Sequence, residues 1–167
     1  MPIAKCGFAS TPDGQPAHEL LVTWGPTIVV DIGFDPNHDS NTAKVPPVPG
    51  TTGLHALVDT GATESCIDSQ LAAQLNLPIV DKRAVSGVHG KHEVNMHLAQ
   101  VHIPALNATI NGVFAGVSLR EGGQLHSALI GRTFLRNFQL LYNGLTGDVE
   151  IRSDDVGLPS KAEKTAT

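Results

Sequence analysis

The sequence predicts an all-β domain, and three observations lead to this class. The chain has 167 residues, the length of one domain, and 41% of them are hydrophobic, which is enough to bury a core. Aromatic residues make up only 4%, so we expect the core to consist mainly of Val, Leu, Ile and Ala. The 17 Gly and 11 Pro residues indicate many turns, and together with frequent Val and Ile they favour short strands.

The N-terminal third contains an arm, two strands and a loop. Residues 1–18 mix Pro, Gly and small residues, which predicts a flexible arm ahead of a domain spanning residues 19–152. Residues 20–24 and 27–34 are β-branched runs separated by a Gly-Pro pair, and we predict a strand for each. Residues 35–53 are polar and proline-rich, which predicts a long loop insertion.

The middle of the chain combines a buried strand with a short helix. Residues 54–58 (LHALV) predict a strand that leads directly into Asp59. Cys66 and Ile67 extend a further short strand. Asp68 or Ser69 then fits the N-cap of a helix over SQLAAQLN, which ends before Pro78.

The remainder again has the pattern of strands. The apolar runs predict strands over residues 78–87, 92–104, 108–119 and 127–130. A short helix is expected over TFLRNF, and residues 138–142 and 148–151 predict a closing hairpin. The polar tail of residues 153–167 is predicted to be disordered.

Composition narrows the possible partners and the compartment. The net charge of −5 and the pI near 5.8 argue against nucleic-acid binding, which normally requires a basic face. No run is long and apolar enough to span a membrane, and the N-terminus lacks the apolar core of a signal peptide. We therefore expect a cytoplasmic protein, in which Cys6 and Cys66 are free thiols; a disulfide between them is the alternative.

The segment with the clearest chemistry is Asp59-Thr60-Gly61-Ala62. Asp59 follows an apolar strand, so its carboxylate is expected where a buried strand enters a turn. Thr60 can hydrogen-bond locally, Gly61 permits close approach of a ligand, and Ala62 keeps the turn small. The simpler interpretation is an Asp that only caps its own turn. Three further motifs in the same chain, described below, favour an active site instead.

A single carboxylate cannot carry out aspartic protease chemistry. That reaction needs two carboxylates that share a proton, one acting as base toward a water and the other as acid toward the scissile carbonyl. The chain contains one Asp-Thr-Gly segment and is too short for two lobes. The hypothesis therefore requires a homodimer in which each copy supplies Asp59.

Four segments in order resemble the retropepsins, the single-lobed aspartic proteases of retroviruses and their cellular relatives. These segments are LVTWGPTIVVDIGF, LHALVDTGATESCID, VSGVHGKHEV and SALIGRTFLRNF, and the resemblance covers roughly residues 19–152. It implies a closed β-barrel or sandwich with a flap hairpin and one or two short helices. It also implies a homodimeric endopeptidase that acts on peptide or protein substrates and needs neither metal nor cofactor.

The resemblance also implies a role for each matching residue. Asp59 is expected to be catalytic, with the Thr60 hydroxyl reaching across the dimer axis and Gly61 accepting from the substrate backbone. Ala62 and Thr63 are expected to line the next part of the cleft. The flap tip, with Gly87, Val88, His89 and Gly90, is expected to cover the peptide, and Arg132 to support the catalytic loop.

Three departures from the viral pattern stand out. Thr63 replaces an Asp that pairs with the motif arginine in many viral members, so we expect Arg132 to use Glu64 or backbone carbonyls instead. The 35–53 loop is longer than its viral counterpart. The chain ends also differ from viral termini, which interleave in the dimer, so the sequence leaves the mode of dimerisation open.

Other functions compatible with this sequence are weaker hypotheses. The same fold suits a dimeric peptide-binding module with weak catalysis, or a dimerisation scaffold. A metal site built from His89, His92 and His97 is disfavoured because their spacing does not bring them to one face. We expect these histidines to be solvated.

Overall fold

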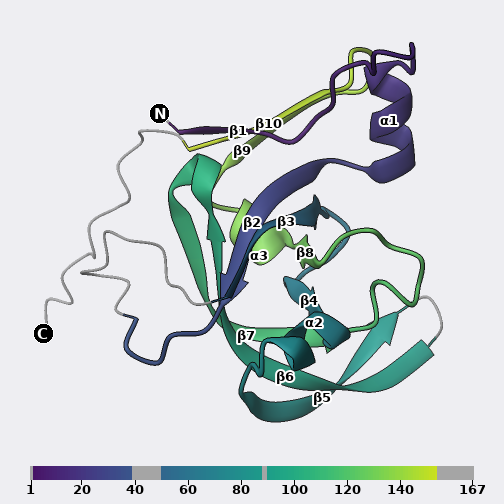
Figure 1. Cartoon of the computed structure of the whole chain (residues 1–167). Coiled ribbons are helices and arrows are strands. Elements are labelled where there is room, and N and C mark those ends of the chain that lie inside the picture. Colours follow the sequence, from purple (N-terminus) through teal and green to yellow (C-terminus); the bar gives the residue numbers. More distant parts are fainter. Residues whose placement is uncertain (1, 39–49, 88–89, 154–167) are drawn as a thin grey trace, which may run out of the picture.

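A computed structural model describes residues 2–38, 50–87 and 90–153, and short strands dominate it (Figure 1). The all-β prediction is confirmed. The strands are β1 (Ile3–Lys5), β2 (Thr27–Gly33), β3 (Gly50–Val58), β4 (Cys66–Asp68), β5 (Ile79–Gly87), β6 (Gly90–Ile103), β7 (Ala108–Val117), β8 (Ala128–Ile130), β9 (Gln139–Asn143) and β10 (Asp148–Arg152). The helices are α1 (Ala17–Trp24), α2 (Ser69–Gln74) and α3 (Arg132–Leu135), with a 3₁₀ turn η1 (Pro104–Leu106).

Six strands close into a barrel. Their order is β2-β3-β8-β4-β7-β6, and β6 returns to β2 through pairs such as Ile32 with Val101. Closure gives each of these six strands a paired neighbour on both sides. The remaining strand of this sheet, β5, pairs only with β6, so the β5–β6 hairpin projects from the barrel (Figure 1).

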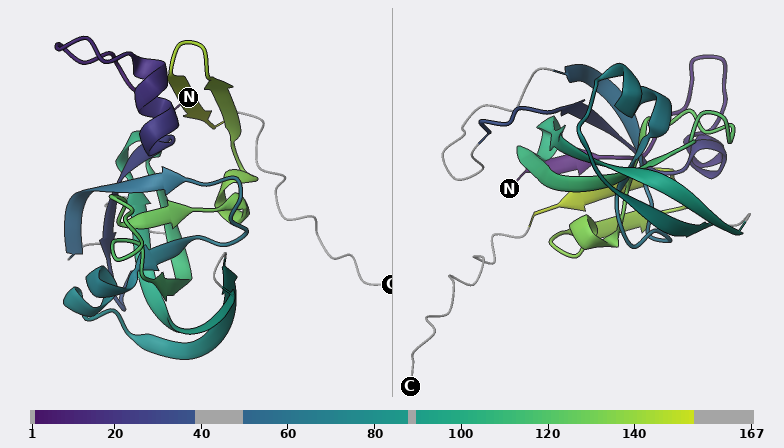
Figure 2. Two further views of the ribbon diagram at one scale, coloured as in Figure 1. Left: turned by 90° about the vertical axis from the view of Figure 1, so that its right-hand side faces the viewer. Right: turned by 90° about the horizontal axis from the view of Figure 1, so that it is seen from below.

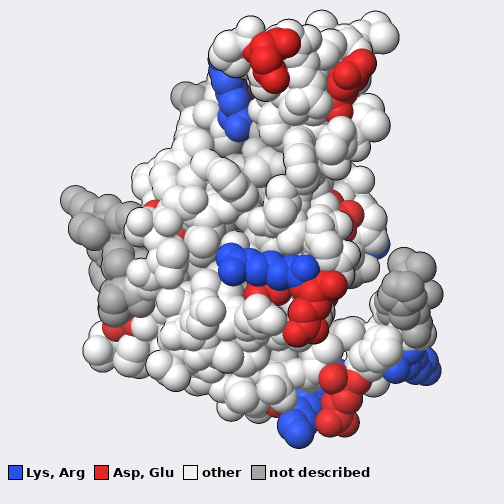
Figure 3. All heavy atoms as spheres, turned by 45° about the vertical axis from the view of Figure 1, so that its right-hand side comes forward, with Lys and Arg blue, Asp and Glu red and all other residues white. Residues whose placement is uncertain are grey.

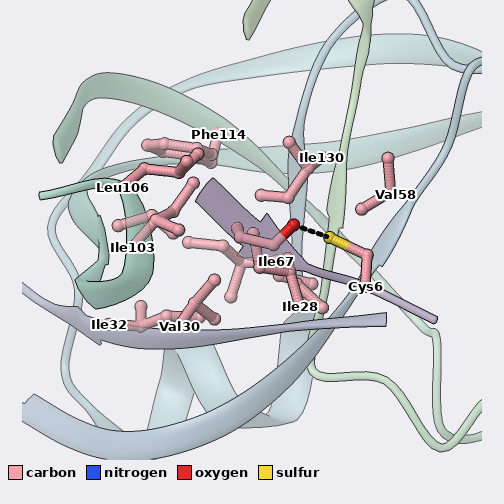
Figure 4. Packing of buried hydrophobic residues seen from close by; sticks show 14 of the residues in the cluster. Cys6, Ile28, Val30, Ile32, Val58, Ile67, Ile103, Leu106, Phe114 and Ile130 are labelled. Carbon is pink, nitrogen blue, oxygen red and sulfur yellow. Dashed lines mark hydrogen bonds between the residues drawn. The ribbon is translucent and has the colours of Figure 1, made fainter. Parts of the chain in front are cut away.

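The barrel interior is aliphatic, as the composition predicts. On β2, Ile28, Val30 and Ile32 are almost fully buried and alternate with Val29, which is 47% exposed. This period of two directs one face of the strand inward. The side chains meet others from β4, β6 and β8 in one cluster, in which Phe114 is the buried aromatic residue (Figure 4).

A second sheet joins the two ends of the described chain. Its order is β1-β10-β9, and Ile3 pairs with Arg152 (Figure 1). Ala4 of β1 and Cys6, just after it, are fully buried. The prediction of a flexible arm over residues 1–18 is therefore wrong for this segment, because its backbone pairs with a strand at the other end of the chain.

Residues 20–24 form a helix, so the predicted strand is wrong. Helix α1 begins after Pro16 and buries Ala17, Leu20 and Leu21, which share one helical face. It ends at Gly25, whose φ of 69° and N–H bond to the Leu21 carbonyl terminate the helix. Figure 2 shows α1 and the three-stranded sheet together at one end of the barrel.

Most other elements lie where the patterns predict them. Asp68 is the N-cap of α2, because its carboxylate accepts from the Leu71 N–H at 3.2 Å. Residues 50–53, predicted as the end of the loop, instead extend β3. Residues 39–49 of that loop, Val88 and His89, and the tail from residue 154 lie outside the described residues.

Two properties of the surface bear on the predicted partners. No described helix has the length and apolar character needed to cross a membrane. Charged side chains lie singly or in small groups of opposite sign on the face drawn in Figure 3. The prediction of solvated histidines is wrong for His97, which is buried and whose Nδ1 lies 3.2 Å from the Leu77 carbonyl oxygen.

Both cysteines are free and buried: Cys6 belongs to the main core cluster, and Cys66 belongs to a second, smaller cluster. Burial raises the pKa of the Cys6 thiol and that of the Cys66 thiol to about 12, from an ordinary value of 9.0. The folded state therefore holds these protons more tightly than the unfolded state. As pH rises from about 9 towards 12, the free energy of unfolding is expected to fall.

We expect neither thiol to react with a disulfide reagent in the native protein at pH 8. A pKa of about 12 leaves a thiolate fraction of about 10⁻⁴ at that pH, and burial also blocks access. The labelling rate with Ellman's reagent should rise at least ~100-fold in denaturant. An added thiol in the Leu145→Cys variant, at a site 91% exposed, is the control and should react at once. Rapid native labelling of Cys6 or Cys66 would contradict this expectation.

Candidate active site

Strand β3 delivers Asp59 to the end of the barrel. Ala56 and Val58 are buried along the strand, and Val58 pairs in parallel with Ile130 of β8. The Asp59 N–H continues this ladder by donating to the Ile130 carbonyl at 3.0 Å. Asp59 is thus the first residue past a buried strand, and it is itself only partly buried.

The turn after Asp59 orients its carboxylate. Oδ1 accepts from the Gly61 N–H at 2.8 Å and from the Ala62 N–H at 3.3 Å. A Cβ at Gly61 would lie 3.0 Å from Oδ1, so a larger residue would crowd this carboxylate. Among the described residues no hydrogen bond is recorded to Oδ2, which leaves that oxygen available to a water or a partner.

A second segment, residues 131–133, hydrogen-bonds to the loop that follows Asp59. The N–H groups of Arg132 and Thr133 donate to the Ala62 and Thr63 carbonyls at 2.9 and 3.0 Å. The Gly131 N–H donates to the Ser65 hydroxyl at 3.0 Å. Because the bonds come from the start of α3, this short helix and the loop form one rigid unit.

The Arg132 side chain adds a further connection to the same loop. Its Nη1 donates to the Thr60 carbonyl at 2.7 Å, and its Nη2 donates to the Thr63 hydroxyl at 2.9 Å. The expected backbone contact is therefore present, while Glu64 is replaced by Thr63 as the side-chain partner. A planar guanidinium suits this arrangement, because its fork presents two donors in fixed directions.

We expect Arg132→Lys to loosen the loop without unfolding the domain. An ammonium group cannot reproduce the fork, and the site is exposed, so the free energy of unfolding should fall by only about 1 kcal/mol. Any hydrolytic activity should fall by about 10-fold, since a small misplacement of Asp59 is costly. Arg136→Lys is the matched control, because no hydrogen bond of the Arg136 side chain is recorded in the described structure. Equal activity of the two variants would contradict a supporting role for Arg132.

A cleft of about 1400 Å³ runs from this loop to the β5–β6 hairpin. The predicted residues Gly61, Ala62 and Thr63 line one end of it. Asp59, Thr60, Gly87 and Gly90 are not among the lining residues of the single chain. Further lining residues come from α2, both hairpin strands, β7 and β8, and include Ala72, Val85, Val94, Ala115, Val117 and Leu129.

The cleft has an apolar floor that the sequence analysis missed. Cys66, Met96, Ala115 and Leu119 form a small buried cluster, separate from the barrel interior. Partly buried Val85, Val94, Val117 and Leu129 pack against it. Burial is the main cause of the raised pKa of the Cys66 thiol, and the negative charges of Asp59 and Asp68 act in the same direction. Cys66 thus contributes a neutral, apolar surface beside Asp59.

The β5–β6 hairpin forms the opposite wall. Its strands pair in register from Asp81 with Met96 to Gly87 with Gly90, the last pair before the turn. Gly90 has a φ of 102°, which residues with a side chain rarely adopt. Val88 and His89, predicted to cover a peptide, lie outside the described residues.

The described residues contain no set of side chains that could coordinate a metal ion. None of their His, Cys, Asp and Glu side chains come together in a group of three or more that could hold one. His92 is exposed on the hairpin, whereas the His97 ring is buried.

Comparisons with known proteins identify a family. The model of the gag-polyprotein putative aspartyl protease family matches residues 48–137, more than half of the chain. Among solved structures, the chain is similar to the EIAV protease complexed with the inhibitor HBY-793. The identity is 20% and the TM-score 0.43, over 66% of this chain and 85% of that one. The search of curated proteins found no match.

Proposed function

The chain belongs to the gag-polyprotein putative aspartyl protease family, and we propose from this membership that it is an aspartic endopeptidase acting as a homodimer. The observation that carries the proposal is the orientation of Asp59. Its Oδ1 is held by two backbone N–H groups of its own turn, those of Gly61 and Ala62, and these two residues line one end of the cleft. A carboxylate that merely capped a turn would not need such a cleft beside it.

The proposed chemistry uses two Asp59 carboxylates, one from each copy. Two like charges in contact cannot both stay ionised, so the pair shares one proton. The ionised carboxylate takes a proton from a bound water while the oxygen of that water attacks the peptide carbonyl carbon. The protonated carboxylate donates to the carbonyl oxygen. The first carboxyl then passes the water's proton to the amide nitrogen, and the second takes back a proton from a hydroxyl of the intermediate. The C–N bond breaks, which releases a carboxyl and an amine product.

The surroundings of Asp59 suit this pairing. Thr60 is exposed beside it, and the structure assigns its side chain no hydrogen bond within the described chain, so its hydroxyl is available to the partner backbone. Arg132 and α3 fix the loop that both copies would bring together. The resulting site needs rigid loops, because two carboxylates must keep one geometry with the water.

We propose extended peptides with apolar side chains near the scissile bond as substrates. The cleft floor formed by Cys66, Ala115 and Leu129 would bury such side chains. The β5–β6 hairpin would act as a flap, with Gly87, Val88, His89 and Gly90 at its tip over the peptide backbone. Gly61, Ala62 and Thr63 would bind the other side of the same backbone.

Cleavage of a diverse peptide library, assayed from acidic to neutral pH, tests this function. We expect hydrolysis next to apolar residues, with a specific activity that falls on dilution because the active species is a dimer. Peptide binding without turnover would favour the binding module, and dimerisation without peptide binding would favour the scaffold. Activity that stays proportional to concentration at every dilution would argue against a site shared between two weakly associated copies.

A further inference from the structure

His97 is a buried polar side chain that the proposed mechanism does not use. It lies on β6, is only 5% exposed, and belongs to the lining of the cleft. Its Nδ1 lies 3.2 Å from the Leu77 carbonyl oxygen. A carbonyl oxygen only accepts hydrogen bonds, so Nδ1 carries the proton of this contact. In the uncharged ring, Nε2 is then a hydrogen-bond acceptor.

The Nε2 atom of His97 has no hydrogen-bond partner recorded among the described residues. Within the described part of the chain, Nε2 of His38 is the only fully buried side-chain nitrogen or oxygen without a partner. Nε2 of His97 therefore keeps some contact with open space, and the cleft is the open space that His97 lines. An unpaired acceptor in so enclosed a place is unfavourable, so we expect a water or a ligand group to donate to it.

Gly116 of β7 leaves room in front of this nitrogen. A Cβ at Gly116 would lie 2.9 Å from His97 Nε2 and 3.0 Å from its Cδ2, so a larger residue would cover the acceptor. The φ of Gly116 is not positive, and its backbone conformation therefore does not itself require glycine. The missing side chain instead keeps Nε2 accessible from the cleft, which Gly116 also lines.

His97 and Gly116 belong to a part of the cleft away from its apolar floor. Successive side chains of a strand point to opposite faces, so His97 faces away from its neighbour Met96, which belongs to that floor. Helix α2 contacts β7, and Figure 1 shows it beside this part of the sheet. We call the space between α2 and these strands the side pocket. Its lining residues are Ala72, Asn76, Leu77, His97 and Gly116.

We propose that the side pocket binds one side chain of the substrate peptide, a neutral hydroxyl or amide that donates a hydrogen bond to His97 Nε2. The inference rests on the proposed function, because the peptide must lie in the cleft for its side chain to reach the pocket. A cationic side chain fits less well, since none of the five lining residues is acidic and a buried charge needs a partner. Alternate side chains of an extended peptide point to opposite sides, so we expect one position of the peptide to respond.

Peptide libraries that hold either Thr or Val at one position at a time test this preference with the full chain. Thr and Val have the same shape, so the ratio of their kcat/KM values reports the effect of the hydroxyl group. A site built to pair with a donor discriminates against the analogue that lacks it. We expect one position at which Thr is preferred at least ~5-fold.

The His97→Asn variant should lose this preference, so that the ratio falls to about 1 or below. The shorter amide can still donate towards the Leu77 carbonyl, but it has no atom at the place of Nε2. A purely structural role of His97 would lower the cleavage of Thr and Val peptides equally. An unchanged ratio in His97→Asn would therefore overturn the proposal.

Gly116→Ala tests the same acceptor without changing the histidine. The added methyl group should cover Nε2, which removes the preference for Thr while peptides with Val are still cleaved. Gly112→Ala, on the same strand, is the matched control, because a Cβ there would meet no atom within 4 Å. This control should keep the wild-type ratio. A ratio that stays the same in both variants would contradict access to Nε2 past Gly116.

The outcomes separate the side pocket from the proposed function. A wild type that cleaves peptides but prefers Thr at no position would overturn the side pocket alone. If the wild type cleaves nothing, binding of the same Thr and Val peptides is measured at pH 8, where imidazoles are ordinarily uncharged. A preference for Thr in binding that His97→Asn removes would support the pocket and remove the protease assignment. A protein that neither cleaves nor binds any of these peptides would overturn both.

Discussion

Replacing Asp59 with Asn is expected to lower kcat/KM for peptide cleavage by about 10³-fold, because in the proposed mechanism general acid and base catalysis both depend on this group. In a homodimer a single substitution removes both carboxylates at once. The amide side chain of the Asp59→Asn variant still has an oxygen that can accept from the Gly61 and Ala62 N–H groups, so the turn should persist. The free energy of unfolding should therefore change by no more than about 1 kcal/mol.

The matched control is Asp31→Asn. Asp31 also accepts a backbone N–H through Oδ1, from Gly53 at 2.9 Å, but it lies on β2 and does not line the cleft. Steady-state cleavage and thermal unfolding of both variants should separate chemistry from folding. If Asp59→Asn cleaved as fast as Asp31→Asn, the activity would have to come from another site or from a contaminant.

The affinity of the Asp59→Asn variant for peptides tests whether the protein is a protease or a binding module. Because the cleft floor is apolar and does not include Asp59, the Asp59→Asn protein should still bind a substrate peptide. The expected result is a loss in kcat with little change in affinity, since the carboxylates act mainly on the transition state. Such a pattern distinguishes a protease from a module whose purpose is binding.

The barrel could be predicted from the sequence because its strands carry local signals. The alternation of Ile28, Val30 and Ile32, and the apolar run before Asp59, each encode one buried face. The order of the Asp59 segment and the Gly131-Arg132 segment pointed to the same family as the family comparison. These signals depend on neighbouring residues, so a single sequence contains them in full.

The errors arise where distant residues decide the structure. Strand β1 has three residues and no periodicity, and it forms only because β10 pairs with it. Residues 22–24 (VTW) favour a strand by propensity, but burial of Leu20 and Leu21 on one face stabilises a helix. The cleft floor combines Cys66, Ala115 and Leu129 from three strands, which no local pattern brings together. Of the two partners expected for Arg132, the backbone carbonyl is present, whereas the side-chain partner is Thr63 and not Glu64.

Gly131→Ala is expected to destabilise the domain by about 3 kcal/mol, because overpacking against rigid atoms is costly. A Cβ at this position would lie 2.6 Å from the Glu64 carbonyl carbon and oxygen, and 2.9 Å from the Thr63 oxygen. All three are backbone atoms of the Asp59 loop, so relief requires that loop to move away from α3. The bonds of the Arg132 and Thr133 N–H groups to Ala62 and Thr63 would lengthen with it. Cleavage by the fraction that still folds should then fall by about 10²-fold, since Asp59 is displaced.

Gly112→Ala provides the control for this substitution. Gly112 lies within β7 of the barrel sheet, but a Cβ there would meet no atom within 4 Å. The same added methyl group should therefore change the free energy of unfolding by less than about 0.5 kcal/mol. Denaturant unfolding and peptide cleavage would be measured for both variants. Equal stability and activity of the two would mean that the Asp59 loop is not braced by Gly131, and that its position depends on the second copy instead.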